Sequence, residues 1–270
     1  MKLGVIISLN EHVNESMKKL KEMGFTTCQL NCWNADMFTD ENAEMVNAAC
    51  KEHDIEISAL WCGYSGPAIW NFIDGPVTLG LVPPAYRFHR AKEILKGAEF
   101  ARKIGVMDIV THVGFIPENP NDIDYSGLVA IIKQIAMSIK PYGQYFLFET
   151  GQETPVTLLR IIEDIGTGNL GINLDPANLL LYGKGNPVDA LDVFGKYVRG
   201  VHGKDGEYPT NGRYLGLEKA MGQGRVNYPA FIAKLKEIGY DGAITIEREI
   251  SGEEQTRDIL AAKTLLESLM

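Results

Sequence analysis

Residues 145–178 read YFLFETGQETPVTLLRIIEDIGTGNLGINLDPAN, in which two short apolar runs flank a segment with helical character. The two runs, YFLFET and LGINLD, are nearly continuous in apolar residues instead of alternating with polar ones. That pattern is typical of parallel β-strands, which are buried on both faces of their sheet. The stretch therefore predicts two parallel strands that are joined by a helix.

The same succession repeats along the whole chain. Segments of helical periodicity alternate with eight strand-like runs: KLGVIIS, TTCQLN, IEISALW, MDIVTHV, YFLFET, LGINLD, VRGVHG and GAITIE. Gly24, Gly105 and Gly239 each follow a helical segment and precede a strand-like run, as glycines that end helices do. Eight such units in 270 residues predict a single α/β domain over residues 1–270. Its architecture would be a (β/α)8 TIM barrel, whose usual length is about 250 residues.

Composition and charge limit the classes of function. The chain holds 26 Lys and Arg against 35 Asp and Glu, a net charge of −9, with 45% hydrophobic and 23% charged residues. These fractions are typical of globular proteins, and the acidic balance argues against binding to the phosphates of nucleic acids. No apolar run is long enough for a membrane span, and the amino terminus does not resemble a secretory signal. We therefore expect a cytoplasmic protein that acts on small molecules.

Two segments exceed the usual connections of such a barrel, residues 62–86 and residues 204–226. Each follows a predicted strand, so each lies on the face of the barrel where catalytic residues gather. The first contains Tyr64, Trp70 and Phe72, which a merely solvated insertion has little reason to hold. We expect this segment to act as a substrate lid, because loops on this rim commonly carry function. A homo-oligomer whose subunits pair through these aromatic residues is the alternative.

The last four predicted strands each end on a side chain that can bind a metal ion: Glu149, Asp175, His202 and Glu247. In a closed barrel the carboxyl ends of neighbouring strands meet at one mouth, so the four positions form one cluster. Three carboxylates and one imidazole favour Mn²⁺ or Mg²⁺, with Co²⁺ and Zn²⁺ as alternatives. Taken singly, Asp175 could also be a helix cap and His202 a structural histidine. Together the four would gather uncompensated negative charge, which favours a bound cation.

Further polar and aromatic side chains stand near the same strand ends. We expect a group of them to contact the substrate: Trp61, Trp70, His112, Gln152, Glu153, Asn178 and Lys204. Lys204 lies two positions past His202, and because strand residues alternate in direction both point to the same mouth. There Lys204 would stabilise an enediolate oxygen or form a salt bridge with Asp205 or Glu207.

These residues lie in segments that resemble a known family. The segments are THVGFIPENP from residue 111, FETGQETP from 148, NLDPANLLLYGKGNPVDAL from 173, VRGVHGKDG from 198 and GYDGAITIEREI from 239. Together they are similar to the xylose-isomerase-like TIM-barrel superfamily, the sugar phosphate isomerase and epimerase group that includes ketose 3-epimerases and inosose dehydratase. The resemblance implies that Glu149, Asp175, His202 and Glu247 bind a divalent metal ion. Asn178 is a departure, because ketose 3-epimerases have a histidine there.

The resemblance also implies the chemistry. We expect a divalent-metal-dependent sugar isomerase or epimerase that acts on an α-hydroxy carbonyl sugar, or a derivative, through a metal-stabilised enediolate. Glu149 and Glu247 would be the acid/base pair. The alternative is a cyclitol or keto-sugar lyase or dehydratase that uses the same metal chemistry. A non-catalytic sugar-binding barrel would not need four intact ligands. Abasic-site endonucleases share the fold, but they require a histidine-rich zinc cluster and a surface less acidic than a net charge of −9 provides.

Overall fold

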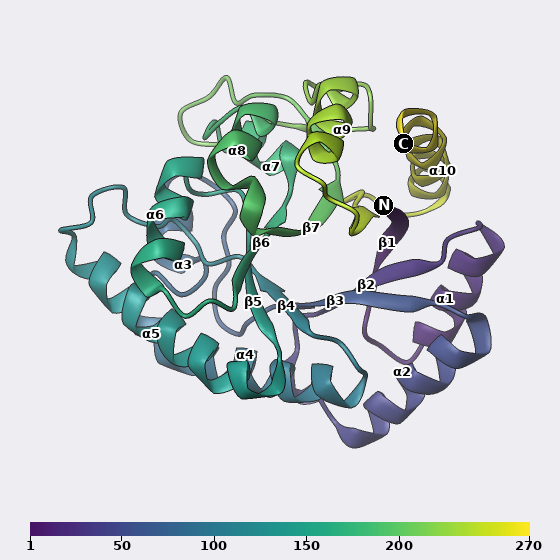
Figure 1. Cartoon of the computed structure of the whole chain (residues 1–270), viewed down its shortest axis with the longest axis horizontal. Coiled ribbons are helices and arrows are strands. Elements are labelled where there is room, and N and C mark those ends of the chain that lie inside the picture. Colours follow the sequence, from purple (N-terminus) through teal and green to yellow (C-terminus); the bar gives the residue numbers. More distant parts are fainter.

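Eight parallel strands close into a barrel inside a ring of helices in the computed structural model, which describes residues 1–270 (Figure 1). The strands are β1 (Lys2–Ser8), β2 (Thr27–Cys32), β3 (Glu56–Cys62), β4 (Asp108–Thr111), β5 (Tyr145–Glu149), β6 (Leu170–Leu174), β7 (Val198–Gly203) and β10 (Ala243–Ile246). They follow chain order around the barrel, and β10 pairs with β1. The predicted (β/α)8 TIM barrel is therefore confirmed, and all strands open their carboxyl ends on one rim.

The helices follow the strands in the order that the sequence predicts. They are α1 (Val13–Glu22), α2 (Asp40–His53), α3 (Gly75–Thr78), α4 (Pro84–Lys103), α5 (Ile123–Ile139), α6 (Pro155–Ile165), α7 (Pro176–Leu181), α8 (Pro187–Phe194), α9 (Tyr228–Glu237) and α10 (Glu253–Leu269). Short 3₁₀ turns occur at η1 (Ala35–Met37), η2 (Lys140–Tyr142) and η3 (Gly195–Tyr197). Gly24, Gly105 and Gly239 have φ angles of 77°, 73° and 75° after α1, α4 and α9, as expected of helix-ending glycines. No helix combines the length and the apolar character that crossing a membrane requires.

One predicted strand is shorter than its apolar run. The run at 107–113 forms β4 only over Asp108–Thr111. The chain leaves the sheet because the carbonyl oxygen of Val113 accepts hydrogen bonds from the backbone of residues 81–82 instead of from a strand. His112 consequently lies just beyond the strand, at the rim where the carboxyl ends of the strands meet.

Apolar side chains form two cores on the two faces of the barrel wall. The larger core lies between the strands and the helices, and the smaller one consists of Ala59, Trp61, Val110 and Leu147 inside the barrel. Much of the remaining interior is polar, with Gln29, Asn173, His202 and Thr245 all buried. Barrels of this kind usually fill their interior with branched apolar residues. The polar filling therefore marks the part of the barrel that supports a functional site.

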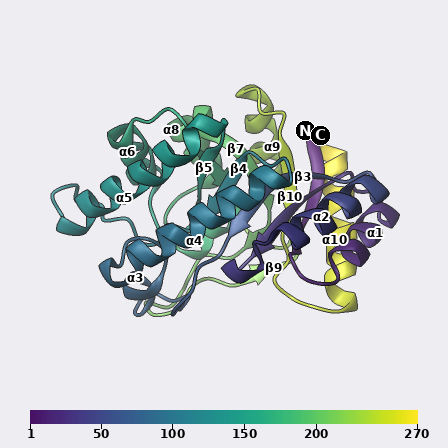
Figure 2. The same cartoon turned by 90° about the horizontal axis from the view of Figure 1, so that it is seen from below.

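The two long loops meet above the rim. Residues 62–86 contain α3, and residues 204–226 contain a small antiparallel sheet of β8 (Asp205–Gly206) and β9 (Glu218–Lys219). The backbone N–H of Phe72 donates to the carbonyl oxygen of Arg213 at 3.0 Å, which joins the two loops. Figure 2 shows α3 and β9 on the side of the barrel away from both chain termini. The two loops are thus joined into a roof above part of the rim, and the role of the first loop as a substrate lid stays a prediction.

Arg90 of α4 fastens the base of the first loop. Its side chain is fully buried and has no carboxylate partner within salt-bridge distance. The guanidinium lies 4.2 Å from the ring centre of Tyr64 and 4.5 Å from that of Tyr86. It donates hydrogen bonds of 2.7 to 3.1 Å to four backbone carbonyl groups of the loop, those of Ser65, Pro67, Thr78 and Gly80. One cation therefore determines the path of both ends of the loop.

Replacing Arg90 with leucine is expected to lower the free energy of unfolding by about 3 kcal/mol, because four buried carbonyl groups lose their donor. The loop 62–86 should also become sensitive to limited proteolysis. Urea denaturation and a timed protease digest measure the two effects. Lys92→Leu, an exposed position on the same helix, is the control and should change neither. Equal digestion of the Arg90→Leu variant and the unmodified protein would contradict this role of Arg90.

Candidate active site

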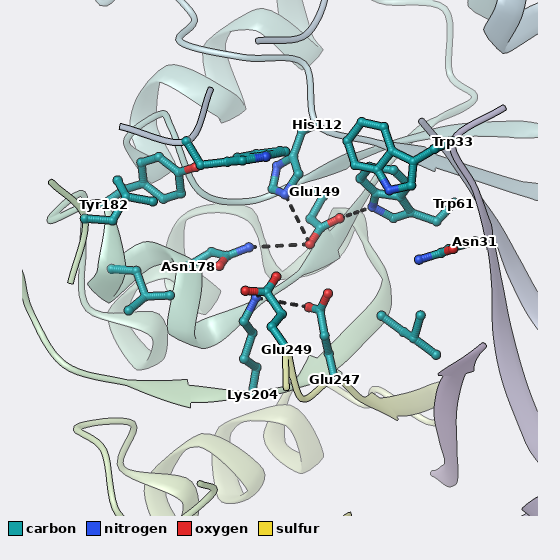
Figure 3. A pocket seen from close by; sticks show the side chains of 14 residues that line it. Asn31, Trp33, Trp61, His112, Glu149, Asn178, Tyr182, Lys204, Glu247 and Glu249 are labelled. Carbon is teal, nitrogen blue, oxygen red and sulfur yellow. Dashed lines mark hydrogen bonds and ion pairs between the residues drawn. The ribbon is translucent and has the colours of Figure 1, made fainter. Parts of the chain in front are cut away.

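A cavity of about 460 Å³ opens at the carboxyl ends of the strands. That volume lies in the range of small-molecule sites. Carboxylates from β5 and from the end of β10 form its floor together with Lys204, and aromatic side chains from the loops form one wall (Figure 3). Most of the side chains predicted to act here do line it: Trp61, Trp70, His112, Glu149, Asn178, Lys204 and Glu247. The convergence follows from the parallel strands, which deliver these separate positions to one rim.

The four predicted metal ligands lie together at the floor. Glu149, Asp175, His202 and Glu247 each offer one ligand atom, and these atoms all lie within 4.8 Å of one another. His202 Nδ1 is the common neighbour: it lies 3.2 Å from an oxygen of Glu149, 3.6 Å from one of Asp175 and 3.2 Å from one of Glu247. The structure thus brings four strand ends that are separated by up to 98 positions into one coordination-sized cluster.

The donor set fits a divalent cation. His202 Nδ1 and Asp175 Oδ2 are buried and make no hydrogen bond of acceptable geometry, although both atoms point into the cluster. Three carboxylates and the ammonium group of Lys204 leave two uncompensated negative charges in a buried site. Buried charge of this kind is costly unless a counter-charge is present. Oxygen donors with a single imidazole suit a hard divalent cation, so the residues present fit a metal ion, and the choice of Mn²⁺ or Mg²⁺ stays a prediction.

Asp175 combines the two roles that the sequence left as alternatives. Its Oδ1 accepts a hydrogen bond of 2.8 Å from the backbone N–H of Asn178 and so caps helix α7. Its Oδ2 has no hydrogen-bond partner and faces His202. The helix cap and the Thr150 hydroxyl, which accepts from the Asp175 N–H at 2.8 Å, fix the carboxylate so that the second oxygen points at the cluster.

Gln29 of β2 orients the imidazole of His202. The Nε2–H of His202 donates to Gln29 Oε1 at 2.8 Å, which directs Nδ1 at the carboxylates, where a bound metal ion would take the place of the Nδ1 proton. Gln29 in turn donates from Nε2 to Asn173 Oδ1 at 3.4 Å. Gly200 makes room for Asn173, since a Cβ there would lie 2.4 Å from that oxygen. A second layer of this type fixes tautomer and ring orientation in metal sites.

The two glutamates differ in how their oxygens are occupied. Glu149 is held on both: Oε1 is near His112, His202 and Asn178, and Oε2 accepts a hydrogen bond from the indole N–H of Trp61. For Glu247 only Oε2 is engaged, 3.2 Å from His202 and 3.3 Å from Lys204. The side chain of Glu247 is 20% exposed, against 2% for Glu149. Glu247 therefore presents an open oxygen to the cavity and Glu149 does not.

Excess negative charge also governs the pKa values in the cluster. Burial opposes ionisation of Glu247, but Lys204 and His202 outweigh it and hold the pKa of Glu247 well below its usual range. Burial would lower the pKa of His202, but Glu149 and Glu247 raise it well above the usual value. The two shifts are the two sides of one attraction: the cations favour the ionised form of Glu247, and the carboxylates favour the protonated form of His202 in the metal-free cluster.

Lys204 forms neither of the salt bridges that the sequence suggested. Its ammonium group lies 2.9 Å from Glu249, 3.3 Å from Glu247 and 3.8 Å from Asp175. Asp205 instead accepts hydrogen bonds from four backbone N–H groups of the second loop, those of Gly206, Gly222, Gly224 and Val226. The proposed pairing with Asp205 or Glu207 was wrong because loop folding occupies Asp205 and turns Lys204 towards the cluster.

Two predicted substrate contacts lie outside the cavity wall. Gln152 and Glu153 are buried, and neither lines the cavity. Conversely, several lining residues were not predicted: Asn31, Trp33, Tyr182 and Glu249. Asn31 lies in β2 next to its last residue, so the rule that polar strand ends converge could have found it. Trp33 and Glu249 lie in loops, where the sequence carries no signal of direction.

Substituting Gln29 with leucine is expected to weaken divalent-metal binding about 10- to 100-fold, because His202 loses the acceptor that fixes its ring. Calorimetric titration of the metal-free protein with Mn²⁺ measures the change. Gln144→Leu is the matched control: Gln144 is a buried glutamine that donates to the Ala98 carbonyl at 2.8 Å, away from the cluster. It should lose stability and keep metal affinity. Equal metal affinity in the two variants would show that Gln29 does not act through His202.

Glu153→Gln is expected to stabilise the protein near neutral pH. Burial raises the pKa of Glu153 to about 8, whereas an unfolded glutamate has a pKa of about 4.3. Between these values the unfolded chain has lost its proton while the folded chain keeps it, so stability falls as pH rises. Glutamine cannot ionise and escapes that loss, which amounts to about 4 kcal/mol at pH 7.5.

Urea denaturation of both proteins with EDTA at pH 4 and at pH 7.5 checks this expectation. The variant should gain stability over the unmodified protein only at the higher pH. Glu163→Gln, at an exposed position, controls for the general effect of removing a carboxylate. A gain of the same size at both pH values would contradict a raised pKa of Glu153.

Comparison with known proteins identifies the family to which this fold belongs. The family described as xylose isomerase-like TIM barrel matches residues 17–268 of this chain. A solved structure of a xylose isomerase domain protein from Planctomyces limnophilus is 35% identical, with a TM-score of 0.93, over 99% of this chain and 96% of that one. A D-tagatose 3-epimerase-like protein is 26% identical, with a TM-score of 0.75, over 100% of this chain and 97% of that one.

A more distant likeness comes from an archaeon. An uncharacterized protein of Methanocaldococcus jannaschii is 26% identical over 288 aligned residues, which cover 100% of this chain and 89% of that protein. With the closed barrel and a metal-ligand cluster at its carboxyl rim, the match over residues 17–268 shows that the chain belongs to the xylose isomerase-like TIM barrel family.

Proposed function

We propose that this protein is a divalent-metal-dependent sugar isomerase or epimerase that acts on an α-hydroxy carbonyl sugar or a derivative. The observation that carries the proposal is the convergence of Glu149, Asp175, His202 and Glu247 at the floor of the cavity. Membership of the xylose isomerase-like family and the likeness to a D-tagatose 3-epimerase-like protein support the same class of reaction.

A divalent cation held by these four residues, Mn²⁺ or Mg²⁺ in preference, would polarise the adjacent oxygens of the substrate and stabilise the negative charge of an enediolate. The chain itself supplies the groups that hold and move the proton. Lys204 and His202 keep Glu247 ionised at neutral pH, since both lower its pKa. An ionised carboxylate with one unoccupied oxygen is able to accept a proton from carbon.

Glu247 is the better placed of the two glutamates for the first proton transfer. Its unengaged oxygen belongs to a side chain that faces the open cavity, whereas the indole of Trp61 occupies the corresponding oxygen of Glu149. Glu149 would be the acid on the other side of the substrate, and because it is ionised it must first take up a proton, which His112, 3.4 Å from its Oε1, is placed to relay. Transfer between the two glutamates produces an epimer, and return by the same glutamate to the neighbouring carbon produces the isomer.

The experiment that tests the proposal is incubation of the Mn²⁺-loaded and Mg²⁺-loaded protein with a panel of ketoses, inososes and keto-glycosides in deuterated water. Deuterium at one carbon of an otherwise intact skeleton supports isomerase or epimerase chemistry. Release of water or of an aglycone would overturn it in favour of the cyclitol or keto-sugar lyase or dehydratase. Absence of any exchange with metal bound would overturn proton abstraction altogether.

Glu247→Gln is expected to reduce deuterium exchange by about 10² to 10⁴-fold, the range for loss of a general base. Glutamine keeps the shape and one oxygen, so weaker metal binding is tested separately by titration with Mn²⁺, and exchange is measured at saturating metal. Glu237→Gln, at an exposed position of α9, should leave exchange unchanged. Exchange at the unmodified rate in metal-saturated Glu247→Gln would exclude Glu247 as the base.

A further inference from the structure

We infer that the substrate is an uncharged sugar carrying a second ring, which stacks on a platform formed by Trp33 and Trp70 at the mouth of the cavity. The inference rests on the proposed function for the identity of the reacting sugar, but the platform and the charge of the cavity are observed independently of it. The inference narrows the substrate class to neutral glycosides. One ring of the glycoside would lie over the metal cluster, and the second ring, a sugar or an aromatic group, would lie at the mouth of the cavity against Trp33 and Trp70.

Charge selects against phosphorylated and carboxylated sugars. The only Lys or Arg side chain that lines the cavity is Lys204, and it lies within 4 Å of Glu247, Glu249 and Asp175. Two nearby guanidinium groups already have partners: Arg90 donates hydrogen bonds to backbone carbonyl groups, and Arg248 forms ion pairs with Glu218 and Asp258. Apart from the metal ion, a phosphate in this cavity would find no Lys or Arg side chain that is not already paired, and it would lie next to Glu247 and Glu249; such a juxtaposition of like charges disfavours binding.

An aromatic wall leads from the metal cluster to the mouth. Trp61 starts it, because its indole N–H binds Glu149 at the floor. Trp33 continues it: its ring centre lies 5.0 Å from that of Trp61 at an interplanar angle of 49°, and 6.3 Å from that of Trp70 at 87°. Because the two outer indoles are nearly perpendicular, a second ring would stack on one of them and contact the edge of the other. Trp70 lies against His112, with ring centres 5.1 Å apart. The wall therefore runs from the carboxylates at the floor to the partly exposed indoles of Trp33 and Trp70.

The outer part of the wall is rigid and incompletely covered. Trp33 and Trp70 are 43% and 39% exposed, whereas Trp61 is 6% exposed. Trp33 rests on Gly63, where a Cβ would lie 2.6 Å from the indole, so the backbone itself supports the ring. Exposed indoles held in fixed positions offer a large apolar contact area at little cost in conformational entropy. The apolar face of a ring is the ligand that matches such a surface.

The proposal is tested by calorimetric titration of the Mg²⁺-loaded protein with five probes: glucose, methyl β-D-glucopyranoside, phenyl β-D-glucopyranoside, cellobiose and glucose 6-phosphate. Phenyl glucoside or cellobiose should bind about tenfold tighter than methyl glucoside, a ratio equivalent to about 1.4 kcal/mol. Glucose 6-phosphate should bind more weakly than glucose. Comparison of phenyl glucoside with cellobiose shows whether the platform prefers an aromatic group or a sugar as the second ring. Because all three tryptophans of the chain line this cavity, a change in intrinsic fluorescence places the bound probe.

Trp70→Ala should weaken the binding of phenyl glucoside and cellobiose more than that of methyl glucoside and so remove the advantage of the second ring, while Trp70→Phe should restore most of the advantage. Phe88→Ala is the control, since Phe88 is 62% exposed on α4 and does not line the cavity. Thermal denaturation verifies that each variant is folded. Equal losses for all probes in Trp70→Ala, no preference for the second ring, or tighter binding of glucose 6-phosphate than of glucose would each overturn the proposal.

The titrations are repeated with EDTA, which separates this inference from the proposed function. A preference for the second ring that persists without metal supports the platform even if deuterium exchange is never observed. A preference that vanishes with EDTA overturns an independent platform, because the affinity would then come from the metal cluster alone.

Discussion

The site depends on balancing three carboxylates that are buried against one another. Glu149, Asp175 and Glu247 lie in a cluster whose ligand atoms fall within 4.8 Å, and separated from water such charges repel strongly. Lys204 offsets one charge and the position of His202 Nδ1 shows where a further positive charge belongs. The polar interior of the barrel follows from this requirement. Gln29 and Asn173 occupy positions where a typical barrel has branched apolar residues, because a ligand imidazole needs a fixed hydrogen-bond acceptor behind it.

The ends of the strands could be predicted from the sequence, and so could the candidate metal ligands, because these residues stand at strand ends. The apolar runs located all eight strands, and the polar residue at the end of each of the last four strands located the candidate metal ligands. Features that depend on side chains from distant segments could not be predicted. In the sequence Gln29 is a single polar residue within a buried strand. Only the closed barrel shows that it accepts a hydrogen bond from His202, which is 173 positions away. The partners of Lys204 were missed for the same reason, since the folding of residues 204–226 around Asp205 decides them.

Asymmetry between the two glutamates arises from the fold rather than from the residue type. Both follow apolar strands, and the sequence treats them alike. The barrel places only β4 between β3 and β5, so Trp61 of β3 reaches Glu149 of β5. Glu247 follows β10, which pairs with β7, and it therefore lies beside Lys204, which follows β7. One carboxylate is thus fixed by an indole, and the other is held ionised by an ammonium group with one oxygen open. Two identical side chains acquire different capacities for proton transfer because their neighbours differ.

Trp61 connects the electrostatic floor to the apolar wall. Its N–H orients Glu149 while its ring continues towards Trp33 and Trp70. An apolar wall next to a charged floor lowers the local dielectric constant, and electrostatic interactions with the reacting atoms become stronger when water is displaced. A ring that covers the outer indoles would displace water from the mouth of the cavity. Binding of that ring and the chemistry at the floor are therefore coupled through one side chain, and the roof formed by residues 62–86 and 204–226, fastened at Arg90, determines how completely water is excluded.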